Sequence, residues 1–106
     1  MSNRDMTLAE LTEAMNRFVD AMGWYAPESP RPQDPRSIAI SLSLEAAEIL
    51  EHFQWRDEAE ADALSEELAD VALYLLQLAH ITGIDLQDAI LEKLDVNYQR
   101  FGQKGQ

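Results

Sequence analysis

The sequence predicts an all-α protein built as a four-helix antiparallel array. Capping residues precede four segments in which apolar residues recur at spacings of three and four, the pattern of a helix with one buried face. Alternation of apolar and polar residues is nowhere long enough for a β-strand. The chain has 106 residues, which is room for one domain. We therefore expect a single helical domain over residues 1–106, with residues 103–106 as a flexible tail.

The first helix is expected from about Leu8 to Met22. The segment from Thr7 to Glu10 has the form of a capping box, with a hydroxyl at the N-cap and a carboxylate three residues later. Gly23 then ends the helix. The next segment, residues 24–35, contains all four prolines of the chain and is expected to be a loop.

The second helix is expected from about Arg36 to Trp55. Asp34 and Pro35 suit its start, because aspartate is a good N-cap and proline is tolerated at the first helical position. One apolar stripe along this helix is expected to face the core. Its members are Ile38, Leu42, Ala46, Ile49 and Phe53.

A charged connector, residues 56–62, separates the second helix from the third. Asp57 and Glu60 are both candidates to cap the third helix, which extends to Ile81 and ends at Gly83. Residues 71–79 of this helix are apolar almost all round, so it should lie centrally or at a subunit interface. A chain this short also buries only about two thirds of its unfolded surface. We therefore expect the chain to associate with further copies of itself.

The fourth helix is expected to begin after the cap Asp85 and to fade near Gly102. Lys93, Asn97 and Arg100 share one face of it. This face could bind phosphate oxygens, with lysine as a point charge and arginine as a fork. Alternatively, the two cations simply stabilise the C-terminal half of a helix, where the dipole favours positive charge.

Charge and composition exclude several classes of protein. The chain has 20 acidic and 8 basic residues, a net charge of −12, which repels nucleic acids and anionic membranes. An anionic substrate would need a metal cation or a local basic patch. The absence of cysteine excludes disulfides, zinc fingers and cysteine nucleophiles. The polar N-terminus and the short apolar runs lead us to expect a cytoplasmic protein without a membrane span.

Four carboxylates form the candidate catalytic and metal site: Glu45, Glu48, Glu67 and Asp70. Each pair is spaced by three residues and so lies on one side of its helix, beside an apolar stripe. Like charges held together there favour a hard divalent cation, and Mg²⁺ prefers oxygen ligands. The alternative is an ordinary solvated helix face, to which we assign the neighbouring Glu66.

Three aromatic residues, Trp24, Trp55 and Tyr74, are candidates for binding a nucleobase by stacking. The alternative for each is a place in the core. His52 and His80 have no partner at the spacing of a zinc site, and we interpret both as structural.

Two segments closely resemble the MazG-like all-α nucleotide pyrophosphohydrolases, especially their dCTP pyrophosphatase branch. They are S-L-S-L-E-A-A-E-I-L-E-H-F-Q-W at residues 41–55 and E-E-L-A-D-V-A-L-Y-L at residues 66–75. The family hallmark is E-x-x-E, a spacer and E-x-x-D, and the spacer here is eighteen residues. The resemblance runs from about Phe18 to Phe101 and includes K-L-D-V-N at residues 93–97.

One segment departs from the family pattern. Relatives often carry a tryptophan and then a short His-x-Pro-basic stretch before the second helix. Here Trp24 is followed by a longer segment that ends in Q-D-P-R at residues 33–36. The histidine is absent, which leaves the base preference open.

The resemblance implies a Mg²⁺-dependent hydrolase that converts a (d)NTP, such as dCTP or a related deoxynucleotide, to the monophosphate and pyrophosphate. Mn²⁺ would substitute for Mg²⁺, and the role would be nucleotide-pool cleansing. The resemblance also implies that the four carboxylates hold the metal and that the basic face of the fourth helix binds phosphates, with help from Tyr74. Trp24 and Trp55 would contact the base or sugar, in part across a subunit interface of a dimer or a dimer-of-dimers tetramer.

Two other functions compete with this interpretation. A non-catalytic acidic helical adaptor that binds a protein partner would need no metal, and Glu45→Ala would leave it functional. A ferritin-like di-iron site would need Glu-x-x-His motifs. The sequence has none, because Glu48 and His52 are four residues apart.

Overall fold

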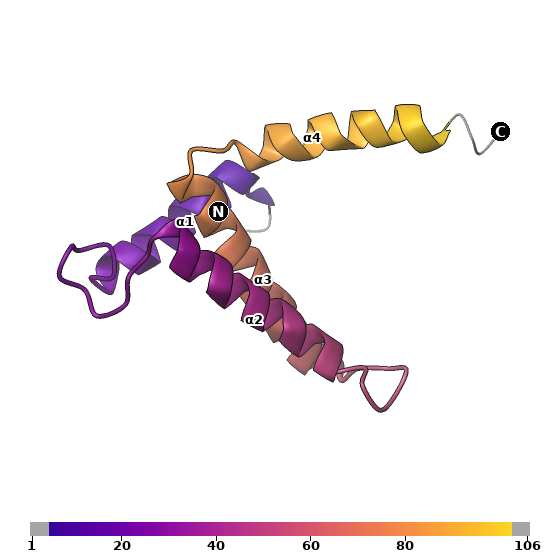
Figure 1. Ribbon diagram of the computed structural model, residues 1–106, viewed down its shortest axis with the longest axis horizontal. Coiled ribbons are helices and arrows are strands. Elements are labelled where there is room, and N and C mark those ends of the chain that lie inside the picture. Colours follow the sequence, from indigo (N-terminus) through magenta and orange to yellow (C-terminus); the bar gives the residue numbers. More distant parts are fainter. Residues whose placement is uncertain (1–4, 103–106) are drawn as a thin grey trace.

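The computed structural model describes residues 5–102, and every regular element in that range is a helix (Figure 1). The all-α prediction with four helices is confirmed. The tail predicted at residues 103–106 lies outside the described residues. The elements are α1 (Leu8–Ala21), α2 (Pro35–Glu51), α3 (Ala61–Ile81), α4 (Leu86–Asn97) and a π-helical turn, η2 (Tyr98–Gly102).

The helix starts follow the predicted caps. The Thr7 hydroxyl accepts from the Glu10 amide at 3.1 Å, and the Thr7 amide donates to the Glu10 carboxylate at 3.0 Å, which completes the capping box. Asp34, Glu60 and Asp85 cap the other three helices through their carboxylates, and Pro35 is the first residue of α2. These side chains replace partners that the first turn of a helix lacks.

Two helix ends follow the prediction and one does not. Gly23 and Gly83 adopt φ values of +76° and +73° just after α1 and α3, a conformation that glycine reaches without strain. The second helix, however, ends at Glu51 and not at Trp55, so that prediction is wrong. Glu48 and Glu51 place negative charge at the negative end of the helix dipole, and the last turn contains no basic residue to offset them.

The helices α2 and α3 lie side by side and run antiparallel, joined by the short segment 52–60 (Figure 1). The helix α1 packs against α3, so α3 is the central helix, as its apolar character predicts. The core is small and is centred on Met15, Val19 and Leu76, with Trp24 and Tyr25 packed against it. Of the predicted α2 stripe, Ile38 is buried, Leu42 and Ile49 are half-buried, and Ala46 and Phe53 are exposed.

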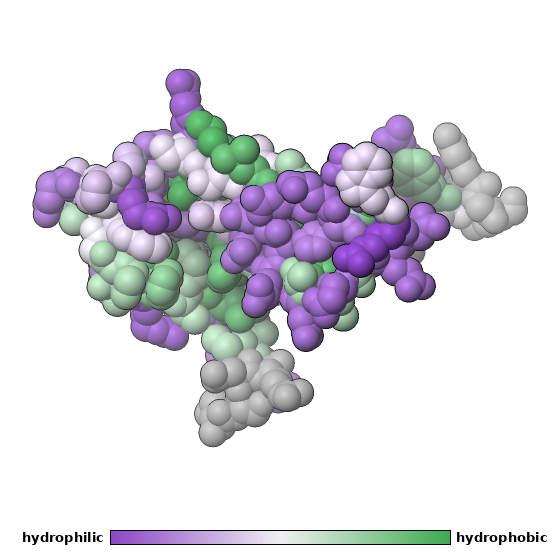
Figure 2. Space-filling view, turned by 90° about the horizontal axis from the view of Figure 1, so that it is seen from below, coloured by the Kyte–Doolittle hydropathy of each residue, from purple (hydrophilic) through white to green (hydrophobic). Residues whose placement is uncertain are grey.

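The helix α4 projects away from the other three (Figure 1). Only its start joins the core, where Leu86 packs against the central cluster. Beyond that point, Leu91, Leu94 and Phe101 are exposed, and apolar side chains also reach the surface between polar ones elsewhere (Figure 2). The radius of gyration is 16.7 Å, against about 13 Å for a compact chain of this length. No helix within residues 5–102 is long and apolar enough to cross a membrane.

We predict that Thr7→Ala destabilises the fold by about 1 kcal/mol, because the first turn of α1 loses its capping oxygen. Thermal unfolding followed by circular dichroism would measure this as a fall in melting temperature of roughly 4–8 °C. Ser43→Ala is the matched control, since its hydroxyl only bonds back to the Ala39 carbonyl within α2 at 2.9 Å. Equal melting temperatures for the two variants would contradict the capping role.

Candidate functional site

Three carboxylates from two helices meet on one side of the α2–α3 pair. One oxygen each from Glu45 on α2 and from Glu67 and Asp70 on α3 lies within 4.8 Å of the others. Glu45 and Glu67 are half-buried, and Asp70 is exposed. Glu48 lies beside Glu45, within hydrogen-bonding reach of it, but outside this group of three. The antiparallel packing of the two helices therefore brings the two acidic motifs together.

The electrostatics of this cluster favour a bound cation. The pKa of Glu45 is raised, chiefly because Glu67 hydrogen-bonds to it, while the bond with Glu48 opposes the shift. Desolvation and the negative charges of Glu67 and Asp70 raise the pKa further. A hard divalent cation would remove this repulsion, and three carboxylates within reach of one another are a donor set that suits Mg²⁺.

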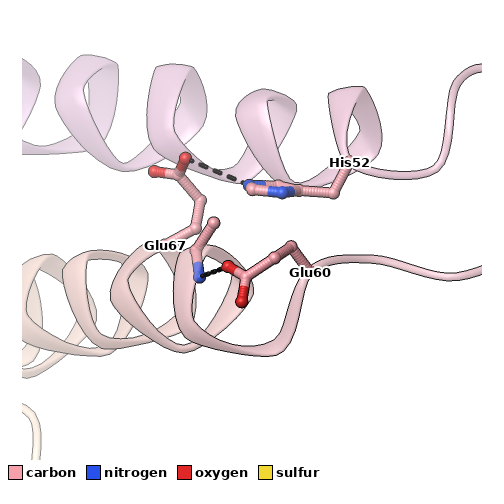
Figure 3. A network of polar contacts seen from close by, with 4 residues as sticks. His52, Glu60 and Glu67 are labelled. Atoms are coloured by element: carbon pink, nitrogen blue, oxygen red, sulfur yellow. Dashed lines mark hydrogen bonds and ion pairs between the residues drawn. The ribbon is translucent and has the colours of Figure 1, made fainter.

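One basic side chain approaches the cluster from the end of α2. Figure 3 shows His52 reaching across to Glu67 on α3, with His52 Nε2 3.6 Å from Glu67 Oε1. Beneath it, the Glu60 carboxylate accepts from the backbone amide of Ala63 at 2.7 Å and holds the first turn of α3. His52 is thus next to the carboxylate cluster, and its interpretation as a structural residue stays a prediction.

A cavity of about 680 Å³ opens beside the carboxylates, between α1, α2, α3 and the proline-rich loop. Glu45 and Asp70 line it together with two of the three predicted aromatic residues, Trp24 and Tyr74. Trp55 does not line it, because α2 ends early and leaves this side chain 88% exposed in the following segment. A volume of this size, with mostly apolar walls and a few polar groups, is typical of a small-molecule site.

The three predicted phosphate-binding residues are not brought to the cavity within one chain. Lys93, Asn97 and Arg100 belong to α4 and η2, and none of them lines the cavity. Arg100 instead stacks its guanidinium over the ring of Phe101, 4.9 Å from the ring centre. Their role in binding phosphate therefore stays a prediction.

The proline-rich loop supplies two cavity residues that the sequence did not single out as binding residues, Arg31 and Gln33. The Arg31 guanidinium lies 4.3 Å from the centre of the Trp24 ring, and Phe18 meets the same ring edge-to-face at 5.6 Å. No local pattern marks Arg31, since its role depends on how the loop folds. A third residue, Gln77, did carry a signal, because it interrupts the apolar run of α3.

Fold and site together define a small all-α protein whose two central helices present clustered carboxylates to an aromatic-lined cavity. The chain belongs to the MazG-like family, whose model matches residues 40–106.

Named relatives share the helical region. The chain is 39% identical to dCTP pyrophosphatase 1 from Rattus norvegicus in an alignment 77 residues long, which covers 63% of this chain and 45% of that protein. The human dCTP pyrophosphatase 1 is 38% identical over the same length and coverage. The chain thus spans less than half the length of these curated relatives. Among solved structures, a pyrophosphatase from Archaeoglobus fulgidus matches with a TM-score of 0.73 at 28% identity, over 95% of this chain and 97% of that one.

We predict that Glu45→Gln raises the melting temperature of the metal-free protein, because it removes one of three clustered negative charges. This increase in melting temperature should be present at neutral pH, where Glu45 is ionised. It should disappear as the pH falls below the raised pKa of this group, where the wild-type carboxyl is already neutral.

The matched control is Glu92→Gln on α4, which removes the same charge far from the cluster and should leave the melting temperature unchanged. Thermal scans at neutral and acidic pH in the presence of a chelator make the measurement. A Glu45→Gln protein that melts below wild type at neutral pH would contradict the repulsion.

Proposed function

We propose that this chain hydrolyses a nucleoside triphosphate to the monophosphate and pyrophosphate, with a divalent cation held by Glu45, Glu48, Glu67 and Asp70. The observation that carries the proposal is the position of the carboxylate cluster, which borders a cavity of about 680 Å³ lined by Trp24. Membership of the MazG-like family and the names of the relatives support it. Mg²⁺ is the proposed ion, with Mn²⁺ as a substitute.

The chemistry follows from what carboxylates and a cation can do. A cation held by Glu45, Glu48, Glu67 and Asp70 would neutralise phosphate charge and activate water. A water oxygen bonds to the α-phosphorus while the bond from that phosphorus to the bridging oxygen breaks and pyrophosphate leaves. In this proposal the proton of the water passes to the carboxylate oxygen of Glu48 that does not bind the cation, since Glu48 lies beside Glu45 at the edge of the group of three.

The cavity walls suggest how the rest of the substrate binds. The proposed substrate is dCTP or a related deoxynucleotide, whose base would lie against Trp24 with Tyr74 nearer to the carboxylates. The proposed role is cleansing of the nucleotide pool in the cytoplasm.

A second copy of the chain is the proposed source of the missing phosphate-binding groups. Lys93 and Asn97 lie on α4 and Arg100 lies on the following turn η2, and α4 projects from its own domain with exposed apolar side chains such as Leu94. Association into a dimer, or a dimer of dimers, would cover this helix and bring its basic face to a neighbouring cavity. Trp55 would join a site in the same way.

The first experiment is a panel of canonical and modified nucleotides with Mg²⁺. Wild type should release pyrophosphate, and not orthophosphate, from at least one of them. Glu67→Gln should lower kcat/KM by about a hundredfold or more, because the cation loses a ligand. Glu66→Gln, one residue away on an exposed position, is the control and should stay active. A wild-type protein with no turnover on the whole panel, or with turnover that survives EDTA, would refute the proposal.

The shared site is tested by mixing two inactive variants. Lys93→Ala and Glu67→Ala should each be inactive alone and should regain partial activity when they are co-refolded, because one kind of mixed site is intact. Co-refolding Glu45→Ala with Glu67→Ala is the control and should restore nothing, since both residues come from one chain. Equal recovery in both mixtures, or none in either, would exclude a site completed by a second copy.

A further inference from the structure

A buried amide stands out among the walls of the cavity. Gln77 on α3 is 3% exposed, and within residues 5–102 it is the one buried polar side chain of the fold. It lies between Leu76 and the half-buried Leu78, so an apolar residue would be the simpler choice for packing. Burying an amide without a partner is costly, and such a residue is retained where its hydrogen bonds have a use.

The partner of Gln77 lies 44 residues earlier in the proline-rich loop. Gln77 Nε2 donates to Gln33 Oε1 at 2.6 Å, and Gln33 Nε2 donates to the backbone carbonyl of Arg31 at 2.8 Å. A backbone carbonyl can only accept, so the amino group of Gln33 must face it. The oxygen of Gln33 must then face Gln77, which must donate. The loop carbonyl therefore fixes the orientation of both amides, and neither can flip without losing a bond.

The amide pair and the carboxylates occupy different parts of the same cavity. Gln77, Tyr74 and Asp70 line it from successive turns of α3, while Ser37 and Glu45 line it from α2. Asp70 and Gln77 are seven positions apart, which is about 10 Å along a helix. With phosphates at the carboxylates, the base of a nucleotide would extend along α3 toward the amide pair.

Gln33 has hydrogen-bonding capacity left after these contacts. Its amide retains one N–H and one oxygen lone pair beyond those used by Arg31 and Gln77. One donor beside one acceptor matches the edge of a nucleobase. Cytosine presents an amino donor and a ring-nitrogen acceptor, whereas uracil presents a carbonyl acceptor and an N–H donor. An amide that could flip would accept both edges, but a fixed one discriminates.

We propose that Gln33 contacts the nucleobase and that Gln77 holds Gln33 in one orientation, so that the pair discriminates between amino- and oxo-substituted pyrimidines. Gln33 is the specificity-determining residue and Gln77 is a positioning residue. The inference rests on the proposed function, because it assigns a base-recognising end to the cavity in which the triphosphate is hydrolysed.

The test compares dCTP with dUTP, which have nearly the same size and shape and differ in the hydrogen-bonding edge of the base. Wild type should favour dCTP by about tenfold or more in kcat/KM, the factor that one net hydrogen bond supplies. Gln33→Ala should bring the ratio close to one while both nucleotides are still hydrolysed. Gln77→Met keeps an unbranched chain of similar volume in the buried position, removes the donor and should relax the ratio in the same direction.

The matched control is Gln54→Ala, an exposed glutamine beyond α2 that does not line the cavity, and it should keep the wild-type ratio. If Gln33 and Gln77 served only to hold the loop in place, both substitutions would lower kcat/KM for the two nucleotides equally and leave their ratio unchanged. A wild-type ratio near one, or an unchanged ratio in both cavity variants, therefore overturns the base-recognising role. Absence of hydrolysis of any nucleotide by wild type would instead refute the proposed function.

Discussion

The antiparallel packing of α2 against α3 is the constraint on which the rest of the site depends. Each helix carries two acidic residues spaced by three, and each pair alone is an ordinary feature of a helix surface. Side by side, the helices bring Glu45, Glu67 and Asp70 within 4.8 Å and raise the pKa of Glu45. Apolar contacts between the helices therefore hold together charges that repel one another. A cation bound there, as proposed, would replace that repulsion with attraction.

The packing of α2 against α3 also shapes the cavity, but it leaves many apolar side chains of the fold exposed. Three helices and the loop enclose a space with a carboxylate region and an amide region, but the core behind it is built from few residues. The helix α4 contributes little to that core beyond Leu86, and its apolar side chains remain exposed. A domain of this size with so much apolar surface would gain stability from the proposed association. The same association would then both stabilise the fold and complete the site.

Helix starts were predictable from sequence because capping is local. Thr7, Asp34 and Glu60 each satisfy backbone amides within three residues, so their effect can be inferred without the fold. The end of α2 was not predictable from apolar periodicity, which continues to Phe53. Glu48 and Glu51 at its negative end disfavour a longer helix, and because α2 ends at Glu51, Trp55 does not line the cavity.

The candidate site likewise contains some residues that could be predicted from the sequence and others that could not. The carboxylates were predictable, because their spacing within each helix and the resemblance to a known family both point to them. Arg31 and Gln33 were not, since their positions depend on a loop that folds back over Trp24 and onto Gln77. Long-range contacts of this kind leave no periodic trace in the sequence. The interruption of the apolar run at Gln77 was the one local sign of them.

Direct binding of a divalent cation to the protein, without any nucleotide, tests the central claim. Mn²⁺ titration followed by electron paramagnetic resonance separates bound from unbound ion and needs no catalysis. Wild type should show saturable binding that Mg²⁺ displaces, and Asp70→Asn should lose it while Glu92→Gln retains it. Binding that is equal in all three proteins, or absent from wild type, would contradict a cation site made by the pairing of α2 and α3.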